Sequence, residues 1–398
     1  MVRSTRLREA AFRLVSVLVG TLIPLIALEA ALRLAGWPRA PVIGWQWRGS
    51  PVKANEFGFR GHRSTGPTSA TVLLLGDSTV EVGRFDEMAE VHLATALRQL
   101  TKDEIRVVSV AAAGWGQDQE LLALKRYLPK IEPRVVALWF TPSNDLWNNT
   151  FPTHNPKRGW PRPTFWLEHN ELRGPNAAWL ESQDRERFYV MRLVDRARGL
   201  APYVTDEEWE SRLPPAYQAS CLDAPDCQTA PSLREVIARQ QNVDPNDVLY
   251  FGGENFASEE THFSIALCPR SPRLEYAANL ARALLAEIAK VCKEHGAELV
   301  VFYHDRAFPE IADTPAQFKV PGGCVTLSGA SARTFIDEVL RPSPALMIRG
   351  VPEGATISRR DRHLNGARDG RAGALAGDSR RRRLAHAARL NGRFPARV

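Results

Sequence analysis

Cysteine is scarce in this chain, with 5 residues among 398. That count excludes a small disulfide-built domain, because such domains use several cross-links in place of a hydrophobic core. No cysteines and histidines fall at the spacing of a zinc site, so we expect no metal. Cys221 and Cys227 are close enough to close a small loop in an oxidising compartment, whereas Cys268 and Cys324 can pair only if the fold brings them together. Cys292 lies on a helical face and is expected to be a buried small hydrophobe.

The chain also lacks a basic surface on its body, although its net charge is +7. From position 359 onward, 12 arginines and 3 aspartates give +9, and the first 13 residues add +3, so the body carries about −5. A nucleic-acid-binding surface needs its positive charge on the folded body. We therefore expect no nucleic-acid partner. The hydrophobic share of 44% and the charged share of 24% further exclude a wholly disordered, collagen-like or multi-span membrane protein.

One long apolar run is present near the N-terminus. Leu14–Leu28 carries no charge, and its extension to Ala10–Leu32 gives about 23 residues, enough to cross a bilayer. Arginines before the run favour a cytoplasmic N-terminal end, with the rest of the chain outside the cytoplasm. No small-x-small cleavage site follows the run cleanly, so we predict an uncleaved anchor over residues 1–36. A cleaved signal peptide and a buried amphipathic helix are the alternatives.

After a linker at 37–69, which is expected to pack on the body, strand and helix patterns alternate. Continuous apolar runs predict buried parallel strands, and apolar residues at helical spacing predict the helices between them. The predicted strands are Thr71–Leu75, Ile105–Val110, Val135–Phe140 and Glu298–Tyr303, and the predicted helices are Met88–Leu100, Asp118–Leu128 and Leu274–His295. This alternation indicates one α/β domain over residues 70–366, with a parallel sheet covered by helices on both faces.

Two parts of the chain break this pattern. Residues 147–270 are rich in Pro, Trp, Asn and charge, and we interpret them as an insertion that forms a lid or rim. The insertion contains Trp147, Trp160 and Trp166, which we expect to pack within loops, with stacking on sugar rings as the alternative. Residues 367–398 are Arg-rich with few large apolar side chains, so we expect disorder there. A shifted reading frame in a GC-rich gene would also explain this tail.

Polar residues follow each predicted strand. Ligands of open parallel sheets bind at the carboxyl ends of the strands, so these residues are the candidates for a functional site. Gly76, Asp77 and Ser78 follow the first strand, Gly114 follows the second, Asn144 and Asp145 follow the third, and the sequence Asp361-Arg362-His363-Leu364-Asn365 comes near the C-terminal end. We expect all four positions to meet at one rim.

This ordered set resembles the SGNH, or GDSL-like, hydrolase superfamily, whose four blocks supply Ser, Gly, Asn and His in that order. LLLGDSTVEVG matches the first block, and DRHLN matches the last in the form of a branch that includes alginate O-acetylation proteins. NEFGFRG at Asn55–Gly61 also recurs in membrane-anchored bacterial members. The third block departs from the family, because Pro142 stands where Gly is usual, and the second lacks the common Asn before its Gly. The resemblance implies a three-layer α/β/α, flavodoxin-like fold with a parallel sheet, preceded by one transmembrane helix.

These residue types suit acyl-ester chemistry. A serine hydroxyl needs a neighbouring base to become a nucleophile, and His363 can accept the proton of Ser78 near neutral pH. Asp361 can orient the imidazole and stabilise its charged form. The backbone N–H groups of Ser78 and Gly114 and the side-chain amide of Asn144 would stabilise the oxyanion formed on attack.

Each of these residues also has a plainer interpretation. Asn144 with Asp145 can be a helix cap, and Gly114 can be an ordinary turn glycine. Asp77 is expected to fix the turn that presents Ser78 rather than to act chemically. The histidines in the middle of the chain are expected to be exposed or structural, namely His154, His262 and His304.

The sequence therefore predicts an SGNH-type serine esterase that hydrolyses acyl esters, acetyl esters first among them, through an acyl-serine intermediate and without a cofactor. One alternative is an O-acyltransferase that modifies an envelope polysaccharide with the same residues. The other is a non-catalytic surface protein that keeps the fold as a scaffold. The expected partners are an acylated small molecule or polysaccharide and the membrane. The expected location is the bacterial inner membrane, single-pass, with the catalytic domain in the periplasm.

Overall fold

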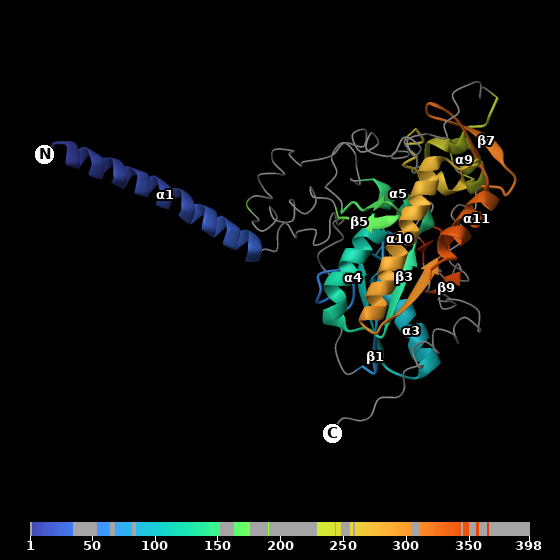
Figure 1. Ribbon diagram of the computed structural model, residues 1–398, viewed down its shortest axis with the longest axis horizontal. Helices are drawn as coiled ribbons and strands as arrows, with labels where there is room; N and C mark the ends of the chain where they lie inside the picture. The colour runs from blue at the N-terminus through green and yellow to red at the C-terminus, as the bar shows by residue number, and fades with distance from the viewer. Residues whose placement is uncertain are drawn as a thin grey trace.

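The computed structural model describes the body of the chain with several gaps. The described residues are 2–34, 54–63, 68–81, 85–151, 163–175, 190, 229–242, 244–247, 255–257, 259–303, 311–343, 345–349, 356–357 and 364–365. They form an elongated N-terminal helix and an α/β body (Figure 1).

A five-stranded sheet forms the centre of the body. Its strands are β1 (Ala70–Gly76), β2 (Ile105–Ala111), β3 (Val135–Phe140), β6 (Glu298–Tyr303) and β9 (Leu346–Arg349). They pair in the order β2-β1-β3-β6-β9, and every pair is parallel. This is the flavodoxin-like order, in which the chain reverses direction across the sheet between β1 and β3. The predicted α/β fold with a parallel sheet is confirmed.

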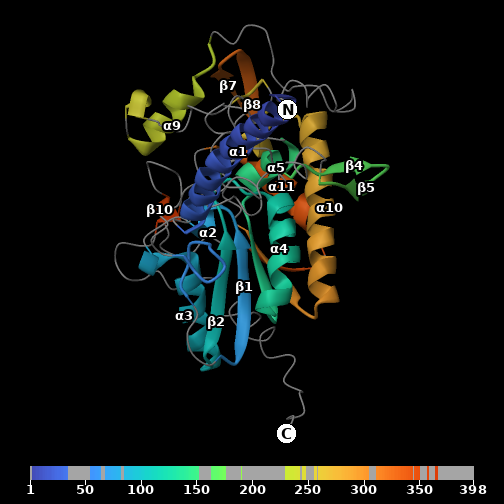
Figure 2. The same ribbon diagram turned by 90° about the vertical axis from the view of Figure 1, so that its left-hand side faces the viewer.

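Helices cover both faces of the sheet. On one face lie α4 (Gln117–Ile131), α10 (Pro272–Glu294) and α11 (Gly329–Leu340), and on the other lie α2 (Ser78–Glu81) and α3 (Ala89–Thr101). Figure 2 shows α4 and α10 on one side of β1 and β2, with α3 on the opposite side. Alternate residues of β1 serve the two cores, since Leu73 packs with the first group of helices and Leu74 with the second. The continuous apolar run of this strand follows from burial on both faces.

Several smaller elements are not in the sequence-based prediction. Within the expected insertion, α5 (Pro142–Thr150) crosses the boundary at 147, and the hairpin β4 (Trp166–Glu168) with β5 (Glu171–Arg173) and the helix α9 (Leu233–Gln241) follow. Beyond β6 come the hairpin β7 (Ala316–Val320) with β8 (Gly323–Leu327), helix α11 and the edge strand β9. Strands β10 (Thr356–Ile357) and β11 (Leu364–Asn365) form a short antiparallel pair.

Part of the segment 37–69 lies on the body. Phe59 is buried and meets Trp115 and Tyr127 edge to face, with ring centroids 5.6 and 5.3 Å apart. Asn55 is also buried, and its side chain donates to the carbonyl oxygen of Ser109 on β2 at 2.7 Å. The segment 54–63 is therefore part of the folded body.

The N-terminal helix α1 (Val2–Leu34) extends away from the body (Figure 1). Its stretch Phe12–Leu34 is 23 residues long, an 18-residue window within it has a mean hydropathy of 2.2, and none of that window is buried. By length and composition α1 is able to cross a membrane. The two charged residues near its end, Glu29 and Arg33, form an ion pair at 2.7 Å, which reduces the cost of placing them close to an apolar environment.

The cysteines that are described fall into two kinds. Cys268 and Cys292 are free, and Cys292 is buried as predicted, with a thiol pKa raised to about 12 by burial. Cys324 is disulfide-bonded, and because Cys268 is free, the two do not pair with each other. Cys221 and Cys227 lie outside the described residues, as does the Arg-rich tail at 367–398.

Candidate functional site

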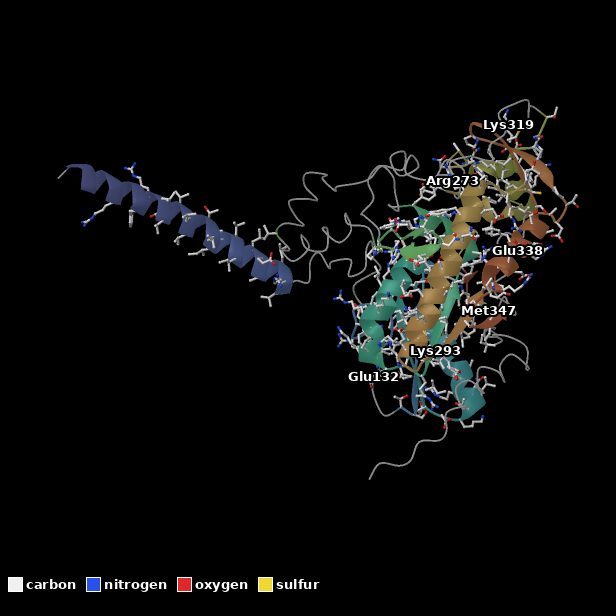
Figure 3. All side chains as sticks on the ribbon, viewed as in Figure 1. Glu132, Arg273, Lys293, Lys319, Glu338 and Met347 are labelled. Carbon is white, nitrogen blue, oxygen red and sulfur yellow. The ribbon has the colours of Figure 1, made fainter. Side chains whose placement is uncertain are left out.

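Ser78 stands at the junction of β1 and α2, at the carboxyl edge of the sheet. It is half-buried and is the first residue of α2, whose backbone N–H groups accordingly point back towards the strand end. Figure 3 marks the opposite edge, where Glu132 and Lys293 lie shortly before β3 and β6. Because β1 adjoins the switch point of the sheet, Ser78 is at the place where ligands of this architecture bind.

Asp77 ties the serine turn to the end of β3. Its Oδ1 accepts from the backbone N–H of Thr79 at 2.8 Å, and its Oδ2 accepts from Nδ2 of Asn144 at 2.9 Å. The first bond fixes the turn, as the sequence predicted. The second binds the Asn144 amide to Asp77, the residue directly before Ser78. An amide nitrogen carries two hydrogens, so a second donor of Asn144 remains for a ligand.

Asn144 lies in the first turn of α5, which begins directly after β3. Thr141 precedes the helix, and its backbone N–H donates to Oδ2 of Asp145 at 2.7 Å. Asp145 thus bonds from inside the helix to the backbone of the N-cap residue, a structural role close to the helix-cap alternative for the Asn–Asp pair. Asn144 does not have that role, because its side chain reaches across the switch point instead. Its Oδ1 is buried and has no hydrogen-bond partner among the described residues.

Gly114 sits in the turn that follows β2. The backbone N–H of Trp115 donates to the carbonyl oxygen of Ala112 at 3.2 Å, which closes a four-residue turn, and Gly114 is its third residue with φ +77°. A positive φ at that position calls for glycine. The backbone N–H of the preceding residue, Ala113, donates to Oε2 of Glu81 at 2.6 Å. Glu81 belongs to α2, so this bond joins the turn to the helix that carries Ser78.

A cluster of buried acids and amides lies behind these residues. Asp145 and Glu120 are both fully buried, and burial, followed by repulsion from neighbouring carboxylates, raises the pKa of each well above its usual value. Nε2 of Gln117 donates to Oδ2 of Asp145 at 2.5 Å, and Oε1 of Gln117 accepts from Asn149 at 2.7 Å. The sequence did not reveal this cluster, because Glu120 lies in a helical segment whose polar residues are ordinarily solvent-exposed.

The described residues contain no cluster of three or more His, Cys, Asp or Glu side chains arranged to hold a metal ion. The acids of the site instead accept hydrogen bonds from side-chain amides and backbone N–H groups.

Two of the predicted site residues, Asp361 and His363, lie outside the described residues. Their role as base and orienting carboxylate therefore stays a prediction. The structure does bring the other three predicted residues to one edge, since Ser78 and Asn144 are linked through Asp77 and Gly114 is linked to α2 through Glu81.

Other aromatic and histidine residues singled out by the sequence have varied settings. Trp147 is on α5 and is buried, and its ring meets that of His262 edge to face at 5.5 Å. These contacts agree with the structural interpretation of both. Trp166 on β4 is exposed to 42%. Trp160, His154 and His304 lie outside the described residues.

Comparison with known proteins gives distant structural likenesses. No family model and no curated protein matches the chain. An alpha/beta hydrolase enzyme from the metagenome of Lake Arreo, Spain, is 14% identical, with a TM-score of 0.22 over 81% of this chain and 94% of that one. A catalytic mutant of an acetylxylan esterase from Geobacillus stearothermophilus is 13% identical, with a TM-score of 0.21 over 82% of this chain and 96% of that one. The fold assignment rests on the strand order and pairing given above.

Proposed function

We propose that this protein is a serine esterase of SGNH type, with Ser78 as nucleophile. The observation that carries the proposal is the joining of three strand ends at the switch point. Asp77 holds the Asn144 amide beside the serine turn, and Glu81 holds the turn that contains Gly114. Serine, glycine and asparagine at these three strand ends match the first three blocks of the superfamily in chain order.

The reaction proceeds through an acyl-serine. Oγ of Ser78 attacks the ester carbonyl carbon while its proton passes to the imidazole of His363, which Asp361 orients. The tetrahedral intermediate collapses, the bond to the leaving oxygen breaks, and the imidazolium returns the proton to the leaving alcohol. A water molecule then attacks the acyl-serine by the same route and releases the carboxylic acid and the free serine.

Charge in the intermediate develops on the former carbonyl oxygen. The N–H groups of Ser78 and Gly114 and one N–H of Asn144 are the donors assigned to it, and loss of a single such donor costs about 3 kcal/mol of barrier stabilisation. Burial raises the pKa of Asp145 and of Glu120, which supports this assignment because a raised pKa reduces the negative charge behind the oxyanion.

The proposed location is the outer side of the cytoplasmic membrane, with α1 as a single-pass anchor. Support comes from the length and apolar character of α1, from the arginines that precede its apolar stretch, and from the disulfide at Cys324. Stable disulfides belong to oxidising compartments. A substrate in the envelope, an acylated small molecule or polysaccharide, follows from that location.

Turnover of p-nitrophenyl acetate tests the proposal. The wild-type protein should release p-nitrophenol, and Ser78→Ala and His363→Ala should each lower kcat by at least about 10³-fold because both belong to one catalytic unit. Ser69→Ala, which removes a hydroxyl bonded to Glu104 just before β1, is the matched serine control and should keep full activity.

Covalent labelling gives a second readout. A fluorophosphonate should phosphonylate Oγ of Ser78 with loss of fluoride, and peptide mass spectrometry should find the adduct there and not at Ser69. Wild-type protein that neither turns over the ester nor takes the label at Ser78 would support the scaffold alternative instead. Acetyl transfer to an added oligosaccharide that outpaces release of acetate would identify the acyltransferase.

A further inference from the structure

We propose that Glu81 is a positioning residue, which sets the Gly114 amide relative to Ser78 through its bond to the neighbouring Ala113. The inference rests on the proposed esterase function and adds to it a residue outside the four blocks. Glu81 is 7% exposed, although an unpaired carboxylate is costly to bury, so its place in the fold requires specific partners.

The geometry of α2 gives Glu81 this role. Ser78 and Glu81 are the first and last residues of a single helical turn, so they move as one unit. Oε2 of Glu81 accepts from the backbone N–H of Ala113 at 2.6 Å. The nucleophile and the loop that carries an oxyanion donor are thereby held at a fixed separation by one side chain.

Arg60 supports Glu81 from the other side. Its Nη1 donates to the carbonyl oxygen of Glu81 at 2.5 Å, and its positive charge favours the ionised form of the buried carboxyl group. Burial is the larger effect and raises the pKa of Glu81, with the Ala113 bond and Arg60 opposing it. Arg60 belongs to the segment 54–63, the part of the linker that lies on the body.

The same segment packs against the loop after β2. The ring of Phe59 meets that of Trp115, the residue after Gly114, and the side chain of Asn55 bonds to Ser109 on β2. Gly114 itself has no side chain with which to fix its position. Its backbone position therefore depends on contacts made by the neighbouring residues. The bond from Ala113 to Glu81 is such a contact, and it ties the turn to α2, the helix that carries Ser78.

The chemical consequence concerns the transition state more than the bound substrate. A donor that is displaced by a fraction of an ångström binds a neutral carbonyl nearly as well, yet stabilises a developing oxyanion much less. Loss of the Glu81 bond should thus lower kcat and leave KM nearly unchanged.

The test compares Glu81→Ala and Glu81→Gln in the full-length chain. Glutamine keeps an oxygen that accepts from Ala113, whereas alanine does not. We expect Glu81→Ala to lower kcat for p-nitrophenyl acetate by about 10- to 100-fold with KM changed by less than about threefold, and Glu81→Gln to recover most of kcat.

Glu90→Ala is the matched control. Glu90 is also buried, its pKa is also raised by burial, and its Oε1 accepts from the backbone N–H of His62 at 2.6 Å. Its bonds within the described residues run to residues 62 and 109 rather than to the turn at 112–115. Glu90→Ala should lower the melting temperature but leave kcat per folded molecule within about threefold.

Amide hydrogen exchange of the peptide that covers residues 111–116 gives a readout independent of turnover. Exchange should be faster in Glu81→Ala than in the wild type, and unchanged in Glu81→Gln and Glu90→Ala. Unchanged exchange in a folded Glu81→Ala overturns the inference, as does a kcat within about threefold of the wild type. If the wild-type chain has no esterase activity but the exchange result holds, the proposed function fails while the Glu81 contact stands.

Discussion

Asp77 lies between the proposed nucleophile and the proposed amide donor, and its two carboxylate oxygens have different partners. One fixes the turn at Thr79 and the other holds Asn144. The sequence predicted the first contact, because an aspartate before a tight turn bonds to backbone N–H groups close to it in the chain. The second joins residues 67 positions apart, and no local pattern contains it.

Asp145 provides a prediction about the pH dependence of stability. Its pKa in the folded protein is raised well above the unfolded value, first by burial and then by repulsion from Asp77. Between the two pKa values the folded state binds more protons than the unfolded one, so the free energy of unfolding falls as the pH rises through that interval. Asp145→Asn removes this ionisation and should flatten the decline that sets in as the pH rises above the usual aspartate pKa of 3.8.

Urea denaturation at several pH values measures this effect. Glu120 titrates in the same cluster, so Asp145→Asn should reduce the slope without abolishing it. Glu171→Gln, at an exposed position on β5, is the control and should follow the wild-type curve. Parallel curves for the wild type and Asp145→Asn would contradict the prediction.

At the scale of elements, the junction of β1 and α2 requires the backbone of Gly76 to lie close to the side chain of Val80. A Cβ atom at Gly76 would lie 2.5 Å from Cγ2 of Val80 and 3.1 Å from Cβ of Trp139. Val80 is fully buried, so its side chain has no space into which to retreat. Glycine at the end of β1 therefore permits α2 to start directly above the strand.

Gly76→Ala should accordingly destabilise the fold by about 1–3 kcal/mol through overpacking. Thermal denaturation measures the loss as a lower melting temperature. The double variant Gly76→Ala with Val80→Ala removes the closest clashing atom, so its loss should be smaller than the sum of the two single losses. Additive losses would show that the contact with Val80 does not limit this junction.

Other elements illustrate where local patterns fail. Helix α11 begins with the small residues Gly329, Ala330 and Ser331, and the four-residue strand β9 lies at the sheet edge. Neither has a long apolar run. Strand β9 pairs with β6, and α11 packs against α10 and the turn at Ser264–Ala266. Their positions depend on tertiary packing more than on their own propensity.

At the scale of the whole molecule, α1 exposes its apolar side chains, whereas the body buries most of its own. No residue of Phe12–Leu34 in α1 is buried, whereas the body has two cores of its own on either side of the sheet. A helix with so much exposed apolar surface is unfavourable in water. The body has no comparable need of α1 for its stability.

Removal of residues 1–36 should therefore convert a membrane-bound protein into a soluble one with nearly the same melting temperature. The full chain should stay with the membrane pellet after an alkaline carbonate wash, which strips proteins bound only at the surface. The truncated chain should appear in the soluble fraction, with its melting temperature within about 3 °C of that of the full chain in detergent. Extraction of the full chain by carbonate, or loss of folding without α1, would contradict this view.

The sequence alone determined the alternation of strands and helices, the apolar N-terminal helix and the positions of Ser78, Gly114 and Asn144 at strand ends. These features follow from periodicity and turn chemistry, which are properties of neighbouring residues. Tertiary structure decided the strand order, the burial of Asp145 and Glu120, and the bonds from Asp77 to Asn144 and from Glu81 to Ala113. Such bonds form because buried polar groups need hydrogen-bond partners, and here the partners lie on neighbouring strand ends that are far apart in the sequence.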